Sequence, residues 1–190
     1  MFENQIKEHI AEKIVLLEQL LTCEYITAID QAVQVMVQRL RAGGRILLAG
    51  NGGSAADAQH FAGEIVGRFM KERPGAAAIS LCCDPSVMTS IANDYGYHSV
   101  FARQIEGLGS RDDVFIAIST SGNSENLIEA IKTAREKGLF SIGLLGKDGG
   151  NIRDLCDLPL VVPSNQTARI QEIHTFTIHL LCEGIESVLF

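Results

Sequence analysis

The sequence has little of several features, and each shortage excludes a class of protein. No basic tract is longer than a couple of residues, and the net charge is −7. An acidic chain without a basic patch binds the phosphate backbone of nucleic acids poorly, so we expect no direct nucleic-acid binding. No apolar stretch approaches the roughly 20 residues of a membrane span. Residues 1–5 lack the basic-then-apolar order of a secretory signal, which favours a cytoplasmic location.

The cysteines do not form a metal or redox motif. There are five of them, an odd number, and no CxxC pair occurs. We therefore interpret them as reduced thiols that act as apolar filler in a cytoplasmic protein. They are Cys23, Cys82, Cys83, Cys156 and Cys182.

Length and hydropathy indicate one packed domain. The chain has 190 residues, 46% of them hydrophobic, and contains no low-complexity segment, linker or repeat. We therefore predict a single domain over 1–190. Two helices, at 1–22 and 24–42, precede the first strand and carry apolar residues at helical spacing. A leading amphipathic helix often packs on a neighbouring subunit, so we expect residues 1–42 to lie at an oligomer interface.

The remainder of the chain alternates between apolar strands and helices. This pattern predicts a parallel sheet covered on both faces, which is a three-layer α/β sandwich with five strands. The predicted strands are 45–49, 77–81, 113–118, 140–145 and 158–162. The predicted helices that follow them are 54–69, 84–93, 123–137, 151–156 and 167–189.

Two turns carry the chemistry of phosphate binding. Residues 50–54, Gly-Asn-Gly-Gly-Ser, and 119–124, Ser-Thr-Ser-Gly-Asn-Ser, each follow a strand and precede a helix. Glycines let the backbone approach a ligand, and the helix start offers free N–H groups to an anion. Neither turn matches GxGxxG or a P-loop. The alternative is that both are merely tight connections.

A second group of polar residues lies in the helices beside these turns. His60 and Glu64 are four residues apart, so they share one helix face and suit a metal ion or a base with its partner. The alternative is an ordinary surface pair. The last helix adds Gln171, Glu172, His174 and His179, and for His174 we expect an indirect or merely structural place rather than metal binding.

These residues together resemble the sugar isomerase (SIS) domain and, more narrowly, the phosphoheptose isomerases. The likeness covers nearly the whole chain. It rests on the two turns, on Asn93-Asp94, and on 169–172 (Arg-Ile-Gln-Glu). It implies a flavodoxin-like fold and a homotetramer with interfacial active sites. The implied reaction is isomerisation of D-sedoheptulose 7-phosphate to D-glycero-D-manno-heptose 7-phosphate through an enediol, for heptose and cell-envelope glycan precursors.

The resemblance also implies roles for individual residues. Glu64 would be the catalytic base and His179 its acid/base partner. One Zn²⁺ per site would be held by His60, Glu64, Gln171 and His179. The substrate would be bound by Asn51, Gly52, Gly53, Glu64, Asn93, Asp94, Ser119, Thr120, Ser121, Ser124 and Gln171.

One geometric argument bears on the metal site. Gln171 and His179 are eight residues apart, which along a straight helix is roughly 12 Å of rise. One ion would hardly be reached by both, so we expect a bent helix or, preferably, ligands from two subunits.

Two other functions remain open from the residues alone. Residues 168–172 and the ending 180–190 also look similar to non-catalytic tetrameric SIS proteins that contact the bacterial replication initiator. A sugar-phosphate sensor would account for the turns, but it would leave the four metal-type side chains unused.

Overall fold

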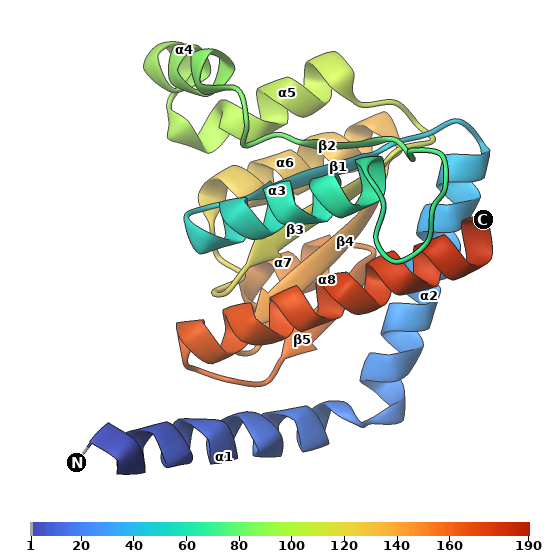
Figure 1. The fold of residues 1–190 in the computed structure, drawn as a ribbon. Helices are drawn as coiled ribbons and strands as arrows, with labels where there is room; N and C mark the ends of the chain where they lie inside the picture. The colour runs from blue at the N-terminus through green and yellow to red at the C-terminus, as the bar shows by residue number, and fades with distance from the viewer. Residues whose placement is uncertain (1) are drawn as a thin grey trace.

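The computed structural model describes residues 2–190 apart from the side chain of Cys23. The predictions made for Met1 and for the Cys23 thiol therefore lie outside the described residues. A parallel sheet of five strands forms the centre of the molecule, in the order β2-β1-β3-β4-β5 (Figure 1). The predicted parallel sheet is thus confirmed. Its strands are β1 (Ile46–Gly50), β2 (Ala78–Ser80), β3 (Val114–Ser119), β4 (Phe140–Gly146) and β5 (Leu158–Val162).

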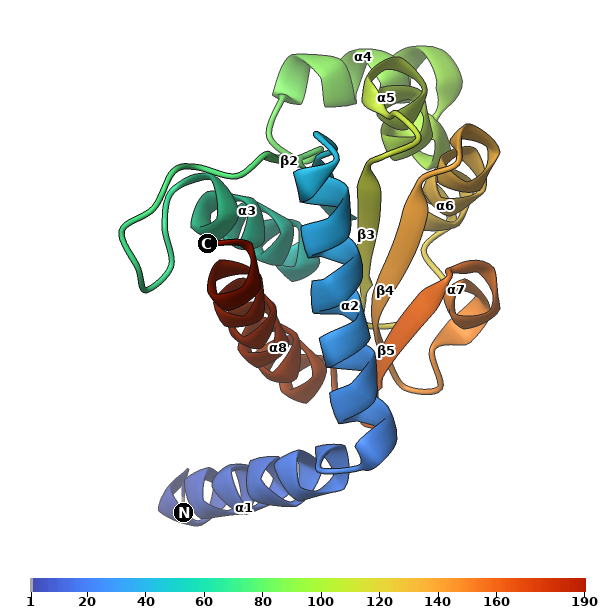
Figure 2. The ribbon, with the colours of Figure 1, turned by 90° about the vertical axis from the view of Figure 1, so that its right-hand side faces the viewer.

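Helices cover both faces of the sheet, so the predicted three-layer architecture is also confirmed. On one face lie α2 (Cys23–Arg41), α3 (Gly53–Val66) and α8 (Thr167–Leu189) (Figure 2). On the other face lie α4 (Pro85–Tyr95), α5 (Val100–Leu108), α6 (Glu125–Lys137) and α7 (Gly150–Leu155). Within β1, Ile46 and Leu48 belong to the first core, whereas Leu47 and Ala49 belong to the second, as the alternation of side chains in a strand requires.

Helix α1 (Phe2–Leu20) projects from this sandwich along its base (Figures 1 and 2). Its only buried residues are Leu16 and Leu20, which pack against Val162 and the start of α8. On the exposed part, large apolar side chains recur every four residues, at Phe2, Ile6, Ile10 and Ile14. Within residues 2–190, every helix is too short or too polar to cross a membrane.

The main difference from the sequence prediction lies in residues 94–112. No element was predicted there, but the structure has the 3-10 turn η1 (Tyr97–Ser99) and helix α5. Gly96, with φ of +87°, interrupts the chain before η1, and α5 is only nine residues long. Helix α5 buries Val100, Phe101 and Ile105 on one face, an amphipathic pattern that the sequence prediction overlooked. Helix α3 also ends at Val66 rather than at residue 69.

Candidate functional site

Both glycine turns lie at the carboxyl ends of their strands, β1 and β3, which are neighbours in the sheet. Ligands of open α/β sheets bind at this edge. Asn51 of the first turn is joined to Asn126, in the helix that follows the second turn, by two reciprocal hydrogen bonds between side-chain amides: Asn51 Nδ2 donates to Asn126 Oδ1 at 3.0 Å, and Asn126 Nδ2 donates to Asn51 Oδ1 at 2.9 Å. The Tyr97 hydroxyl also donates to Asn51 Oδ1, at 3.0 Å. Asn51 therefore links the first turn to the start of α6, through Asn126, and to the segment after α4, through Tyr97.

The second turn is held by its own serines. The Ser119 hydroxyl accepts the N–H of Gly122 at 3.1 Å and lies 3.3 Å from the Ser124 hydroxyl. Ser121 accepts the N–H of Asn123 at 3.2 Å. The side chain of Ser124, at the N-cap of α6, makes no capping hydrogen bond. The start of α6 therefore retains the character of an anion site, with hydroxyls beside it.

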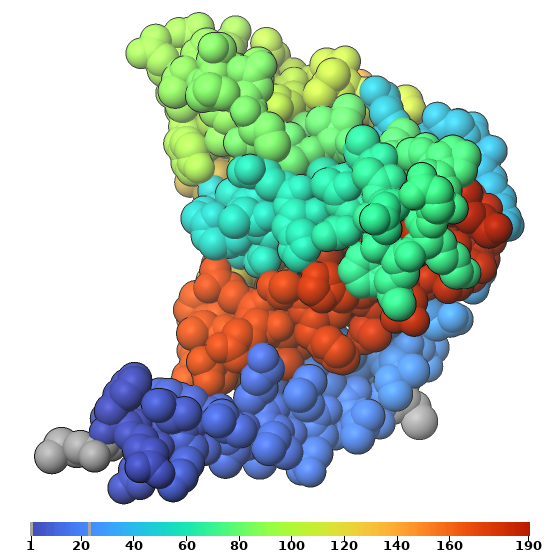
Figure 3. All heavy atoms as spheres, viewed as in Figure 1, coloured from blue at the N-terminus to red at the C-terminus, as the bar shows by residue number. Residues whose placement is uncertain are grey.

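The predicted residues of α3 and α8 lie along one seam, where these two helices pack side by side (Figure 3). At its start, the side chain of Gln171 lies so close to Gly53 that an added Cβ would come 3.0 Å from Gln171 Cδ. In the middle, the Thr175 hydroxyl donates to Asp57 Oδ1 at 3.1 Å. Further along, the rings of His60 and His179 meet edge-on with centroids 5.1 Å apart.

The predicted catalytic and metal residues thus come together only in part. His60 Nε2 lies 3.2 Å from Glu64 Oε1, and both side chains are partly open to solvent. The ring of His179 is also packed by Phe69, at 5.5 Å between centroids. Gln171 stays at the other end of the seam. In the part of the chain that the structure describes, no three His, Cys, Asp or Glu side chains are arranged to hold a metal ion.

Asp57 is a polar group of the seam that sequence reasoning missed. Burial raises the pKa of its carboxyl, against the hydrogen bond from Thr175 and the attraction of His60, which both lower it. Its Oδ2 is buried without a hydrogen-bond partner. The sequence signal was its position three residues before His60, on the same helix face.

A buried ion pair fixes the far end of the seam. Arg73 Nε donates to Glu186 Oε1 at 2.9 Å, with both side chains at most 3% exposed. Glu186 also accepts the backbone N–H groups of Phe69, Met70 and Lys71. Burial alone would raise the pKa of Glu186, but these donors and Arg73 outweigh it and hold the pKa at about 2. The pair anchors the loop after α3, which carries Phe69 onto His179.

Asn93 and Asp94 are less well connected to the site. They lie exposed near the end of α4, and Asn93 Nδ2 donates to Asp94 Oδ1 at 2.8 Å. Tyr97, which follows Asp94 by three residues in the chain, is hydrogen-bonded to Asn51 of the first turn. Apart from this bond to each other, neither one makes a side-chain hydrogen bond to a predicted site residue among the described residues.

His174 has the structural place expected for it. It is fully buried, and its Nε2 lies 3.0 Å from the Leu145 carbonyl oxygen. Burial lowers its pKa to about 4, although the hydrogen bond to Leu145 works to raise it. The cysteines with described side chains are free thiols: Cys156 and Cys182 are buried as expected, but Cys83 is exposed.

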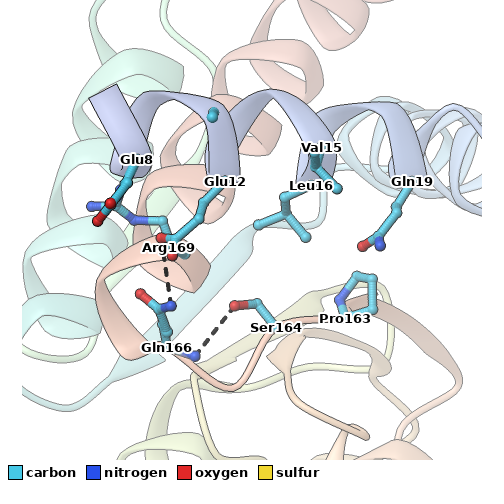
Figure 4. A pocket seen from close by; sticks show the side chains of 10 residues that line it. Glu8, Glu12, Val15, Leu16, Gln19, Pro163, Ser164, Gln166 and Arg169 are labelled. Atoms are coloured by element: carbon cyan, nitrogen blue, oxygen red, sulfur yellow. Dashed lines mark hydrogen bonds between the residues drawn. The ribbon is translucent and has the colours of Figure 1, made fainter. Parts of the chain in front are cut away.

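A groove of about 550 Å³ lies elsewhere, between α1 and the loop before α8 (Figure 4). Glu8, Glu12, Gln166 and Arg169 line it together with apolar side chains of α1. None of the predicted site residues lines this groove. The predicted site residues instead lie at the two turns and along the α3–α8 seam.

Comparison with known proteins identifies the class of protein that this fold and surface define. The SIS domain family matches residues 9–146. The phosphoheptose isomerase of Trichlorobacter lovleyi is 49% identical over 187 residues, 98% of this chain and 93% of the relative. Phosphoheptose isomerase 2 of Campylobacter jejuni is 50% identical over 188 residues, 98% of this chain and 94% of the relative.

Solved structures narrow the class further. The phosphoheptose isomerase from Neisseria gonorrhoeae superposes with a TM-score of 0.93 at 44% identity, covering 99% of this chain and 100% of the other. The enzyme from Francisella tularensis gives a TM-score of 0.94 at 35% identity, covering 98% and 99%. The chain belongs to the phosphoheptose isomerase family and is an isomerase. Family membership favours the enzyme over the initiator-binding and sensor alternatives.

Proposed function

We propose that this protein isomerises D-sedoheptulose 7-phosphate to D-glycero-D-manno-heptose 7-phosphate through an enediol intermediate, as a cytoplasmic step toward heptose precursors of cell-envelope glycans. The observation that carries the proposal is the combination of a phosphate-type turn at one sheet edge with His60, Glu64 and His179 on the adjoining seam. Relatives with the corresponding name align over nearly the whole chain.

The phosphate would bind at the second turn. The hydroxyls of Ser119, Thr120, Ser121 and Ser124 and the uncapped start of α6 offer donors to the phosphate oxygens. The sugar chain would then lie along the first turn, with contacts from Asn51, Gly52, Gly53 and Gln171. Asn93 and Asp94 would contact it from α4.

The proton transfer would be performed by Glu64. A carboxylate beside an imidazole can take a proton from one of the two adjacent carbons and return it to the other. Glu64 is only partly exposed and is oriented by His60, so it is held in place before substrate arrives. His179 would exchange a proton with the substrate oxygens, and its ring is fixed between His60 and Phe69.

The chemistry of this donor set fits zinc, because two imidazoles and a carboxylate are a common set for a catalytic zinc ion. His60, Glu64 and His179 would hold it, which requires His60 and Glu64 to give up their mutual hydrogen bond. Bound zinc would supply Lewis-acid polarisation of the substrate carbonyl. Gln171 lies against Gly53, which supports a substrate contact within one protomer. Under this proposal Gln171 would act as a zinc ligand only at a site shared with a partner subunit.

A homotetramer with interfacial active sites is part of this proposal. The apolar stripe of Phe2, Ile6, Ile10 and Ile14 stands in solvent, and it continues into a groove between α1, α2 and α8 that includes Phe176 and Leu180. Large exposed apolar surfaces mark interfaces, and a second copy of this chain would cover this one. Light scattering should give a tetramer, and Ile6→Glu with Ile10→Glu should dissociate it. A monomeric wild-type protein would contradict the proposal.

The decisive experiment is incubation of the metal-loaded protein with sedoheptulose 7-phosphate and detection of the aldoheptose product. Glu64→Gln keeps size and hydrogen bonding but removes the base, so it should bind substrate and lose at least 100-fold in kcat, on the order of a general base's contribution. His60→Ala should lose zinc in metal analysis. Glu172→Gln, on the neighbouring helix but outside the proposed set, serves as control. Unchanged turnover in Glu64→Gln would overturn the base assignment.

A further inference from the structure

Asn126 is a buried polar residue that no sequence motif singles out. It lies in the first turn of α6 with 4% of its surface exposed. A buried amide is costly unless its donors and acceptor are paired. Its pairing is with another side chain, that of Asn51, through the two reciprocal hydrogen bonds of 3.0 and 2.9 Å. The two residues are 75 positions apart in the sequence.

This pairing fixes which end of the Asn51 amide faces which way. Asn51 Oδ1 accepts two hydrogen bonds, from Asn126 Nδ2 and from the Tyr97 hydroxyl, so both of its lone pairs are engaged. Asn51 Nδ2 donates one hydrogen to Asn126, and an amide nitrogen carries two. The group that Asn51 has left to offer a ligand is therefore an N–H donor and not a carbonyl acceptor.

We propose that Asn126 is a positioning residue for the sugar-binding turn: it holds the Asn51 amide so that Asn51 presents an N–H to an oxygen of the sugar phosphate. The inference rests on the proposed function, because it takes Asn51 as a substrate contact. It extends that proposal by stating that Asn51 is the hydrogen-bond donor in its contact with the substrate. Tyr97 has a smaller share in the same task, since it supplies only one of the bonds and lies at the surface.

The test is a double-mutant cycle between the two asparagines. Asn126→Asp has the same shape but cannot donate to Asn51 Oδ1, so a carboxylate oxygen faces a carbonyl oxygen and the Asn51 amide loses its fixed orientation. We expect the Kd for sedoheptulose 7-phosphate, measured by calorimetry, and the KM to rise about tenfold, the equivalent of one hydrogen bond to the ligand. The value of kcat should change much less, and Tyr97→Phe should raise KM by a smaller factor.

The cycle separates positioning from a structural role. If Asn126 acts through Asn51, then Asn126→Asp adds no further rise in Kd to a protein that already carries Asn51→Ala. A similar rise in both backgrounds, or no rise in the single variant, would overturn the inference. Because Kd is read without turnover, an inactive wild-type protein would refute the proposed reaction and leave this cycle to be judged on binding. Asn4→Asp, exposed on α1, is the control and should leave Kd unchanged.

Discussion

Gly122 in the second turn offers the sharpest test of how the candidate site is built. Its φ is +65°, and a Cβ added there would overlap the carbonyl oxygen of Gly149 and lie 2.8 Å from the nitrogen of Gly150. Both contacts are with backbone, so they cannot be relieved by turning a side chain. The start of α7 would have to move away from the turn.

The magnitude follows from two separate costs. A residue with a Cβ in the left-handed region is disfavoured by roughly 1–2 kcal/mol. Moving the start of α7 would also break the hydrogen bonds from Ile152 N to the Gly122 oxygen and from Asn151 N to Asn123 Oδ1, both 3.0 Å long. Each is worth about 0.5–1.5 kcal/mol, so Gly122→Ala should lower the free energy of unfolding by about 2–5 kcal/mol.

Gly43→Ala is the matched control. Gly43 has φ of +87° at the end of α2, and nothing lies within 4 Å of its added Cβ, so only the conformational cost applies. Urea unfolding at one fixed protein concentration should shift the midpoint of Gly122→Ala by about 1–2 M and that of Gly43→Ala by about half as much. Only Gly122→Ala should raise the KM for the sugar phosphate. Equal shifts in the two midpoints would refute the overlap argument.

Three further predictions concern the core, the buried ion pair and the thiols. Phe61→Ala, at a fully buried position in α3, should lower the free energy of unfolding by about 3–5 kcal/mol, whereas Val66→Ala, half exposed on the same helix, should cost far less in the same urea assay. The pKa of Glu186 in the folded protein is about 2, against an ordinary 4.5, so its contribution to stability is present above pH 4.5 and is lost as the pH falls toward 2. Glu186→Gln should therefore flatten the dependence of the free energy of unfolding on pH in that window. A variant whose pH dependence runs parallel to that of the wild-type protein would contradict the argument. A thiol reagent at pH 8, followed by mass spectrometry, should label the exposed Cys83 before the buried Cys156 and Cys182. Burial raises the pKa of Cys156 to about 11 and that of Cys182 to about 12, so these two should stay unlabelled until the chain unfolds.

The sequence was informative where structure is determined locally. Apolar runs such as residues 46–49 and 114–118 predicted buried parallel strands, and the glycines of both turns marked the sheet edge correctly. The pair His60 and Glu64 could also be predicted, because four residues along one helix bring two side chains together. Each of these patterns depends on residues that are close in the chain.

The missed residues depend on partners far away in the chain. Asn126 pairs with a residue that is 75 positions away in the sequence. The partner of Asp57 is 118 positions away, and the partner of Arg73 is 113 positions away. A single Asn or Arg has no periodicity, so nothing in the sequence distinguished Asn126 and Arg73 from solvent-exposed residues, and for Asp57 the only signal was its place on the helix face of His60. Only the folded arrangement shows that each is a fixed point of the site.

The seam between α3 and α8 separates two groups of predicted site residues along the same helix pair. Both helices start at the edge where the turns lie, and their contacts advance in step from Gly53 with Gln171 to His60 with His179. Gly53 and His60 are seven residues apart on α3, and Gln171 and His179 are eight residues apart on α8. Each separation corresponds to roughly 10–12 Å of rise along the helix. Because α8 is continuous from Thr167 to Leu189, it cannot fold back to bring Gln171 beside His179. Within one protomer, Gln171 therefore lies with the two turns, and His179 lies further along the seam with His60.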